Sequence, residues 1–241
     1  MTKALVALLA IALAACSVTE KETPATPDLS GSTSNESGFF SPGIESKLQP
    51  GTKDQAGLVW INPNANWQQF SKVYIAPVTV GLGPNDNVSE EDQQKLASYY
   101  YHQLESNISK YFTVVNQPGP GVMAVRVALT DATTATPVLR TISVVIPQAR
   151  LLNAVGNMAT GSYAFVGTAQ SQGEITNSVT HEVLAAAVDK RSGGMSIKNA
   201  DVWEWGDAEN AMDYWAQKIA TRLNEFHSGT APTASLARPL S

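Results

Sequence analysis

The sequence predicts an α/β or α+β fold, in which a single domain holds a mixed β-sheet with two main helices packed on it. Two helical patterns, one after Ser89 and one after Asp207, predict the helices, and runs rich in β-branched residues predict the strands. A strand, a helix and a second strand in succession favour parallel pairing, whereas two strands joined by a short turn favour antiparallel pairing. Both kinds of pairing together predict a mixed sheet, and we expect a signal peptide and a disordered tether before it.

Residues 1–15 have the pattern of a bacterial signal peptide. Lys3 precedes an apolar run, residues 4–15, that is too short to span a bilayer. The small residues in Leu13-Ala14-Ala15-Cys16 suit cleavage by a signal peptidase, and the thiol of Cys16 can receive a diacylglycerol. We therefore expect lipidation at Cys16. An ordinary signal peptide cut near Ala15, or a cysteine buried in the core, would be the alternatives.

The surroundings of Cys16 also predict a location. The resemblance to bacterial lipoproteins implies three acyl chains, one of them a palmitate, and several chains hold a protein on a membrane far more firmly than one. Ser17 follows the cysteine, in place of the aspartate that resembles an inner-membrane retention signal. We expect a lipid anchor in the cell outer membrane and a domain that faces the periplasm. Since the chain has no other cysteine, no disulfide is expected.

Composition divides the mature chain into three parts. Residues 16–37 are rich in Ser, Thr, Pro and Glu, which predicts a disordered tether with an r.m.s. reach of about 25 Å. Residues 38–227 are expected to fold, and residues 228–241 to form a disordered tail. The formal net charge of −5 gives no reason to expect a nucleic-acid partner.

The first half of the folded part predicts two strands and a helix. Residues 57–63 form a short strand-like run, and residues 72–80 are so continuously apolar that we expect a central strand covered on both faces. Ser89 and the three acidic residues after it predict a capped helix. The apolar positions of this helix recur at helical spacing: Leu96, Tyr100, Leu104, Ile108 and Phe112.

The second half predicts more strands and a final helix. Residues 113–115 and 122–129 are expected to complete a βαβ unit and to add a neighbouring strand, and residues 173–178 and 182–189 to form a hairpin. A last helix should begin near Ala208 with Asp207 as its cap. One apolar stripe along this helix should pack on the sheet: Ala211, Met212, Trp215, Ile219, Leu223 and Phe226.

Residues 132–167 give the weakest pattern in the chain. They combine a Thr-rich piece with apolar and Gly-containing pieces. A buried crossover and a loop that contacts a partner or the membrane are both compatible with this composition.

Several of these segments together resemble an uncharacterised family of lipoproteins from Gram-negative bacteria, which is classed only as a domain of unknown function. The residues that carry the resemblance are Gly38-Phe39-Phe40, residues 72–80, Leu129-Thr130-Asp131, Thr180 and Glu182-Val183-Leu184-Ala185. Where the family tends to show an acidic residue and a Thr-Gly turn, this chain has Asn177 and His181. The resemblance implies an envelope location and a fold, and it implies no activity.

Patterns that would predict catalysis or a cofactor are absent from the sequence. His102, His181 and His227 lack the spacing of metal ligands, and each is expected at the surface or at a helix end. Ser162 lacks the GxSxG context of a hydrolase, and Gly156–Gly161 lacks the lysine of a phosphate loop. We expect no enzyme activity, no cofactor and no metal.

Aromatic residues are the remaining candidates for contact with a partner. Trp203 and Trp205 are two residues apart and would lie on one side of a strand, as a core lid or as a contact surface. Trp60 and Trp67 have the same two interpretations, and Tyr163 lies in the undetermined segment. The sequence thus favours a noncatalytic envelope protein that scaffolds or regulates a complex with a protein partner. An oligomeric component of an export assembly, and a glycan or small-ligand binder, are the alternatives.

Overall fold

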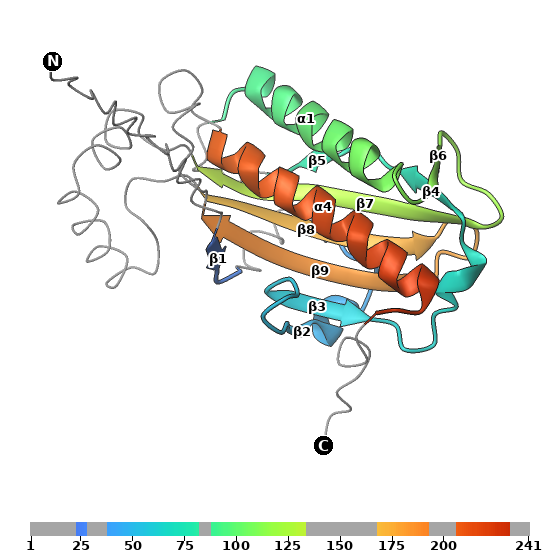
Figure 1. Cartoon of the computed structure of the whole chain (residues 1–241). Helices are drawn as coiled ribbons and strands as arrows, with labels where there is room; N and C mark the ends of the chain where they lie inside the picture. The colour runs from blue at the N-terminus through green and yellow to red at the C-terminus, as the bar shows by residue number, and fades with distance from the viewer. Residues whose placement is uncertain (1–22, 28–37, 82–87, 134–167, 193–205, 232–241) are drawn as a thin grey trace, which may run out of the picture.

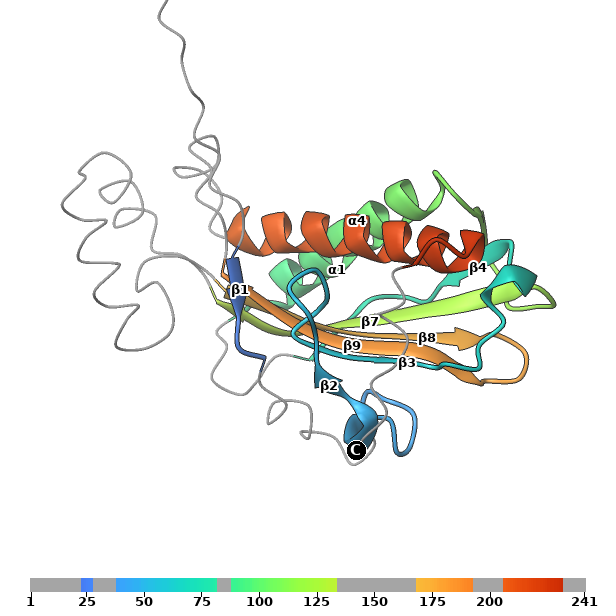
Figure 2. The same ribbon diagram turned by 60° about the horizontal axis from the view of Figure 1, so that its bottom comes forward.

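The computed structural model describes residues 23–27, 38–81, 88–133, 168–192 and 206–231, and these residues form a mixed sheet with two long helices on one face (Figures 1 and 2). The order of the nine strands along the sheet is β2-β3-β9-β8-β7-β4-β6, with β1 paired to β9 and β5 paired to β7. The predicted fold class is therefore confirmed as a single α+β domain. The bounds are β1 Thr23–Ala25, β2 Gln49–Pro50, β3 Leu58–Ile61, β4 Lys72–Ile75, β5 Thr79–Val80, α1 Glu90–Ile108, β6 Thr113–Val115, β7 Val122–Thr133, β8 Thr168–Asn177, β9 Val183–Ser192 and α4 Gly206–Ser228, with 3-10 turns η2 Glu45–Lys47 and η3 Trp67–Gln69.

The parallel part of the sheet contains the predicted βαβ unit, β4-α1-β6. Strand β4 pairs in parallel with β6 on one side and with β7 on the other, so β7 neighbours β4 and is separated from β6 by it. The capping prediction for α1 is confirmed, because the side chain of Ser89 accepts the backbone N–H of Asp92 at 3.1 Å. Of the three consecutive tyrosines in α1, only Tyr100 is fully buried.

The prediction of one central strand over residues 72–80 is wrong. The run is divided into β4 and β5 by Ala76-Pro77-Val78, where the proline supplies no N–H to a ladder. Strand β4 lies next to the short edge strand β6. Along β4, Val73 and Ile75 are buried, whereas Lys72 is exposed and Tyr74 is partly exposed. The helices therefore cover one face of this strand, and its apolar character reflects β-branched residues rather than burial on both sides.

The antiparallel part is the predicted hairpin in a longer form. Strands β8 and β9 are each ten residues long and pair antiparallel with each other, and β7 and β3 flank them. His181 closes the turn with a φ of 60°, a left-handed conformation that side chains other than glycine seldom adopt. The turn thus forms with histidine at the position where the resembled family tends to have glycine.

Helix α4 begins at Gly206, so Asp207 lies in its first turn and is not the residue before it. Its end is a Schellman motif, in which Gly229 has a φ of 70° and the N–H of Thr230 reaches the carbonyl of Glu225 at 2.9 Å. Ala231 then packs against the core. The predicted tail over 228–241 therefore starts too early, because residues 228–231 complete the helix end.

Strand β1 corrects the predicted tether over residues 16–37. Thr23, Pro24 and Ala25 pair antiparallel with Ser192, Arg191 and Lys190 at the end of β9. Composition favours disorder here, yet the free edge of β9 offers backbone partners that composition does not reveal.

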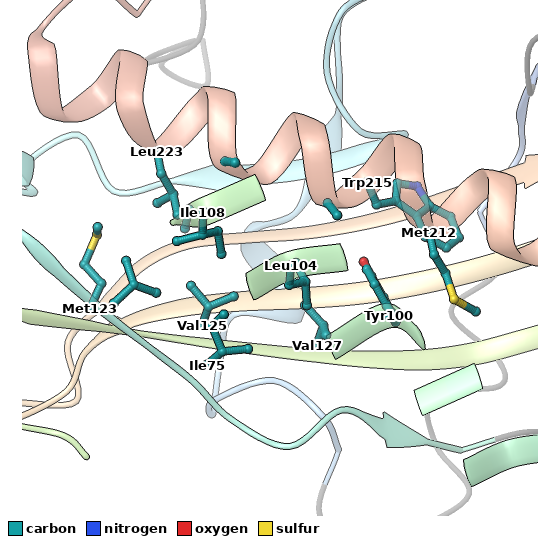
Figure 3. Packing of buried hydrophobic residues seen from close by; sticks show 14 of the residues in the cluster. Ile75, Tyr100, Leu104, Ile108, Met123, Val125, Val127, Met212, Trp215 and Leu223 are labelled. Carbon is teal, nitrogen blue, oxygen red and sulfur yellow. The ribbon is translucent and has the colours of Figure 1, made fainter. Parts of the chain in front are cut away.

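Two apolar clusters of unequal size lie on the two faces of the sheet. The larger lies between the sheet and the helices, where Tyr100, Leu104 and Ile108 of α1 meet Trp215 and Leu223 of α4 over the sheet (Figure 3). The smaller lies on the opposite face and contains Phe40, Ile44, Ala186 and Val188. Among the described residues, no helix is long and apolar enough to cross a membrane.

Candidate functional site

A cavity of about 150 Å³ lies between α4 and the helix-covered face of strands β3, β8 and β9. It runs along the helix from Tyr100 and Trp215 to Phe226. Apolar side chains form most of its wall, and the loop of residues 51–57 lies at its mouth. Among the described residues this is the best candidate for a binding site.

Small residues of the sheet form the floor of the cavity. Gly173 of β8 pairs with Ala187 of β9, which pairs in turn with Val59 of β3, so these positions share one row across the sheet. A Cβ atom added at Gly173 would meet only Val127, at 3.8 Å. The space therefore exists because glycine and alanine stand where a strand usually carries a larger side chain.

The apolar stripe of α4 forms the roof. Trp215, Ile219 and Leu223 recur at helical spacing and line the cavity together with Phe226. The ring of Phe226 stacks on Trp67, with 4.7 Å between ring centroids and 19° between ring planes. Because these side chains are anchored in the larger core, the roof is a preformed surface.

Asp189 holds three elements together at one end of the cavity. Its carboxylate accepts the indole N–H of Trp215 at 2.8 Å, the Nε–H of Arg191 at 2.6 Å and the backbone N–H of Gly57 at 2.8 Å. Asp189 and Arg191 are both buried, and the cost of burying the pair is offset by these bonds. Strand β9, helix α4 and the mouth loop are thereby tied to one side chain.

Tyr100 closes the floor beneath Trp215. Its hydroxyl lies 3.1 Å from the hydroxyl of Ser171, and its ring centroid lies 6.0 Å from that of Trp215. Burial raises the pKa of Tyr100 well above the ordinary value for tyrosine, and Asp189 adds to this rise. Tyr100 is therefore a neutral wall of the cavity.

The mouth of the cavity carries charges of both signs. Arg222 donates to Glu225 at 2.7 Å and to the backbone carbonyl of Asp54 at 3.0 Å. Lys218 lies with its Nζ 5.6 Å from the centroid of the Tyr214 ring. A mixed polar rim around an apolar centre is the arrangement that protein contacts usually have.

The cavity suits the burial of one apolar group. A cavity of this volume lined by aliphatic and aromatic side chains can hold a benzene-sized group, whereas pockets for larger ligands usually measure about 300–1,000 Å³. Sugars need polar partners for their hydroxyls, and the wall supplies few. Within the described ranges, no group of three or more His, Cys, Asp or Glu residues could hold a metal ion.

Most of the candidate residues predicted from the sequence lie in parts of the chain that the structure does not describe. Cys16, Tyr163, Trp203 and Trp205 lie outside the described residues, as does most of the segment 132–167. Trp67 is buried in the larger core, and Trp60 packs against the smaller core with Lys47 4.8 Å from its ring centroid.

The three histidines are at the surface or at a helix end, as predicted. His102 and His181 are exposed, and His227 lies in the last turn of α4.

The small residues of the cavity floor and the pair Asp189 and Arg191 are not among the residues predicted from the sequence to form a site. Gly173 inside a strand, and the run Ala185-Ala186-Ala187 opposite it, were the available signal, because strands seldom place small residues side by side without a reason. Asp189 and Arg191 were a second signal, since charged residues two apart on a strand point to the same face.

The chain belongs to the family described as "protein of unknown function (DUF3313)", which matches residues 35–219. This finding confirms the predicted resemblance to an uncharacterised family. No curated protein matches the chain.

Solved structures with a similar arrangement are distant. A PelC dodecamer from Paraburkholderia phytofirmans is 9% identical with a TM-score of 0.36, and the match covers 66% of this chain and 95% of that chain. Protein XCC0632 from Xanthomonas campestris, of the DUF330 family, is 10% identical with a TM-score of 0.38 and coverage of 70% and 93%. Hypothetical protein CT253 from Chlamydia trachomatis is 10% identical with a TM-score of 0.36 and coverage of 66% and 99%.

Proposed function

We propose that this chain is a noncatalytic lipoprotein of the cell envelope, anchored through Cys16 in the outer membrane and facing the periplasm, whose domain binds a protein partner. The preformed apolar cavity under α4 is the main support for this binding role. Its occupant in this proposal is one aliphatic or aromatic side chain of the partner. The small residues before Cys16, in the run Leu13-Ala14-Ala15-Cys16, support the anchor.

The dimensions of the cavity favour a partner side chain over a free ligand. Its volume matches a single apolar side chain, and such side chains, inserted in preformed pockets, provide much of the binding energy at protein interfaces. The rim contains Asp54 and Lys218, with opposite charges, which suits the mixed polar border of a polypeptide contact. A second copy of this chain would be one form of protein partner, and the test distinguishes it.

The experiment combines crosslinking in living cells with binding to purified protein. A photoreactive amino acid replaces Gln55 at the mouth of the cavity, and the captured protein is identified and purified. Binding of that protein is then compared between the wild type and two variants that fill the cavity, Gly173→Val and Ala187→Leu. We expect each filled variant to bind at least about tenfold more weakly, because the loss of one buried anchor costs more than about 1.4 kcal/mol.

The controls separate binding from folding. Tyr111→Ala removes an exposed aromatic side chain away from the cavity and should keep the wild-type affinity. Urea denaturation should show that the filled variants remain folded. Equal affinity in the wild type and both filled variants would contradict the proposed site, and hydrolysis of peptidoglycan or of an ester by the purified domain would contradict the noncatalytic role.

A further inference from the structure

Strand β1 lies between the residue expected to carry the lipid and the rest of the domain. Thr23 pairs with Ser192 and Ala25 with Lys190, so the chain enters the sheet at the end where β9 finishes. Figures 1 and 2 both show β1 at the end of the sheet where α4 begins. Just after β1, Pro27 packs so closely on Gly57 that a side chain at Gly57 would collide with it. Two independent contacts thus hold this short segment on the domain.

The paired strand shortens the connection to the anchor. Seven residues lead from Cys16 to Thr23, and seven extended residues span at most about 25 Å. If β1 were unpaired, the free connection would run from Cys16 to Gly38 and could extend to about 75 Å. The pairing of β1 therefore decides how far the domain can move from the membrane and which end of it stays close.

We infer that β1 holds the end of the sheet where β9 finishes and α4 begins against the lipid surface, with the hairpin turn of residues 178–181 at the far end. This inference rests on the proposed lipid anchor at Cys16. Strand β8 runs for ten residues between the two ends, which separates them by about 33 Å. The partner in this contact is the bilayer itself, and the geometry leaves the far end free for proteins.

Charge does not supply this orientation. The formal net charge of the chain is −5, and three of its acidic residues, Glu90, Glu91 and Asp92, lie in the first turn of α1 at the end near the membrane, where Lys95 pairs with the last two. Anionic headgroups repel such a surface, so the near end is retained by the length of the chain and not by adhesion. The orientation should therefore change little between low and high salt.

The test measures energy transfer from the domain to acceptor-labelled lipids. The acylated full chain is placed in vesicles of phosphatidylethanolamine and phosphatidylglycerol that contain a headgroup acceptor. A single new cysteine carries the donor, either Glu91→Cys at the near end or Val179→Cys at the far end, where both side chains are exposed. We expect the donor at position 91 to be quenched at least about twofold more than the donor at position 179, given the separation of about 33 Å.

Two matched insertions test the role of β1. Twenty Gly and Ser residues are inserted either after Thr19, before β1, or after Ser32, beyond β1. Only the insertion before β1 should lower the quenching at position 91, because the insertion beyond β1 lies outside the connection that the strand defines. Circular dichroism of both proteins checks that the domain remains folded.

The outcomes separate the orientation from the anchor. If both insertions lower the quenching equally, or if positions 91 and 179 are quenched alike, the inferred orientation is wrong although the anchor stands. A mature protein whose mass shows no acyl chains, and which does not float with vesicles, overturns the anchor and the orientation together.

Discussion

Tyr100 combines a fully buried ring with a hydroxyl that has one polar neighbour, Ser171. Burial raises the pKa of this tyrosine above its ordinary value of about 10, so the folded state retains a proton that the unfolded state releases in alkali. The contribution to stability is complete below about pH 10 and decreases as the pH rises toward the folded pKa. Tyr100 alone should lower the free energy of unfolding there by up to about 1.4 kcal/mol for each pH unit.

The variant Tyr100→Phe tests this linkage. Its free energy of unfolding should be about 1 kcal/mol lower at neutral pH, because the hydrogen bond to Ser171 is lost. Above pH 10 its stability should fall less steeply than that of the wild type. Urea denaturation at several pH values between 8 and 11 measures both effects. Tyr111→Phe, which changes an exposed tyrosine, is the control and should keep the wild-type slope. Parallel curves for Tyr100→Phe and the wild type would contradict the role of this tyrosine.

Among the secondary-structure elements, the turn between β8 and β9 has a strained backbone at one residue, His181. His181 adopts a φ of 60°, and its N–H reaches the carbonyl of Asn177 at 2.9 Å, while the Asn177 side chain accepts the N–H groups of Val179 and Thr180. A left-handed conformation costs an L-residue with a side chain about 1 kcal/mol or more, and glycine avoids this cost. The hydrogen bonds of the turn therefore maintain a conformation that the histidine itself disfavours.

Replacing His181 by glycine should therefore stabilise the protein. We expect His181→Gly to raise the free energy of unfolding by about 1 kcal/mol, seen as a higher urea midpoint with an unchanged slope. Thr180→Gly, one residue earlier, should destabilise, because it adds flexibility where no positive φ requires it and removes the side chain that accepts the N–H of Glu182. A loss of stability in His181→Gly would show that the imidazole makes a contact that outweighs the strain.

Some secondary-structure elements could be predicted from the sequence and others could not. Helices α1 and α4 and the β8–β9 hairpin were predictable, because their apolar periodicity or their turn is a local property of the sequence. The division of residues 72–80 and the pairing of β1 depend on which neighbours the sheet supplies, and those neighbours are distant in sequence. The cavity depends on Gly173 and Ala187 meeting across two strands, so the small residues were visible while their juxtaposition was not.

At the scale of the whole molecule, the described residues form one sheet with a separate core on each face, and the two cores differ in which elements cover them. Two long helices close the larger core, whereas a segment without long helices, residues 38–50, lies over the smaller one. Glu174 of β8 fastens this segment, because its buried carboxylate accepts the backbone N–H of Ser41 at 2.8 Å and the Ser41 hydroxyl at 2.9 Å. Arg126 of β7 donates to the same carboxylate at 2.8 Å, and its guanidinium lies 4.9 Å from the Phe39 ring centroid.

The dependence of the smaller core on Glu174 predicts a local opening and not a global one. In Glu174→Ala the N–H of Ser41 loses its acceptor, and the guanidinium of Arg126 keeps only the carbonyl of Phe39 as an acceptor. The loss of about 1–3 kcal/mol falls on the covering segment. Amide hydrogen exchange in residues 39–48 should accelerate by about tenfold or more, while the amides of α1 and α4 keep most of their protection. The control Glu182→Ala, which removes an exposed carboxylate that accepts from Asn62, should leave exchange in residues 39–48 unchanged. If Glu174→Ala accelerates exchange equally in α1, α4 and residues 39–48, then the two cores unfold as one unit and the sheet transmits the loss from one face to the other.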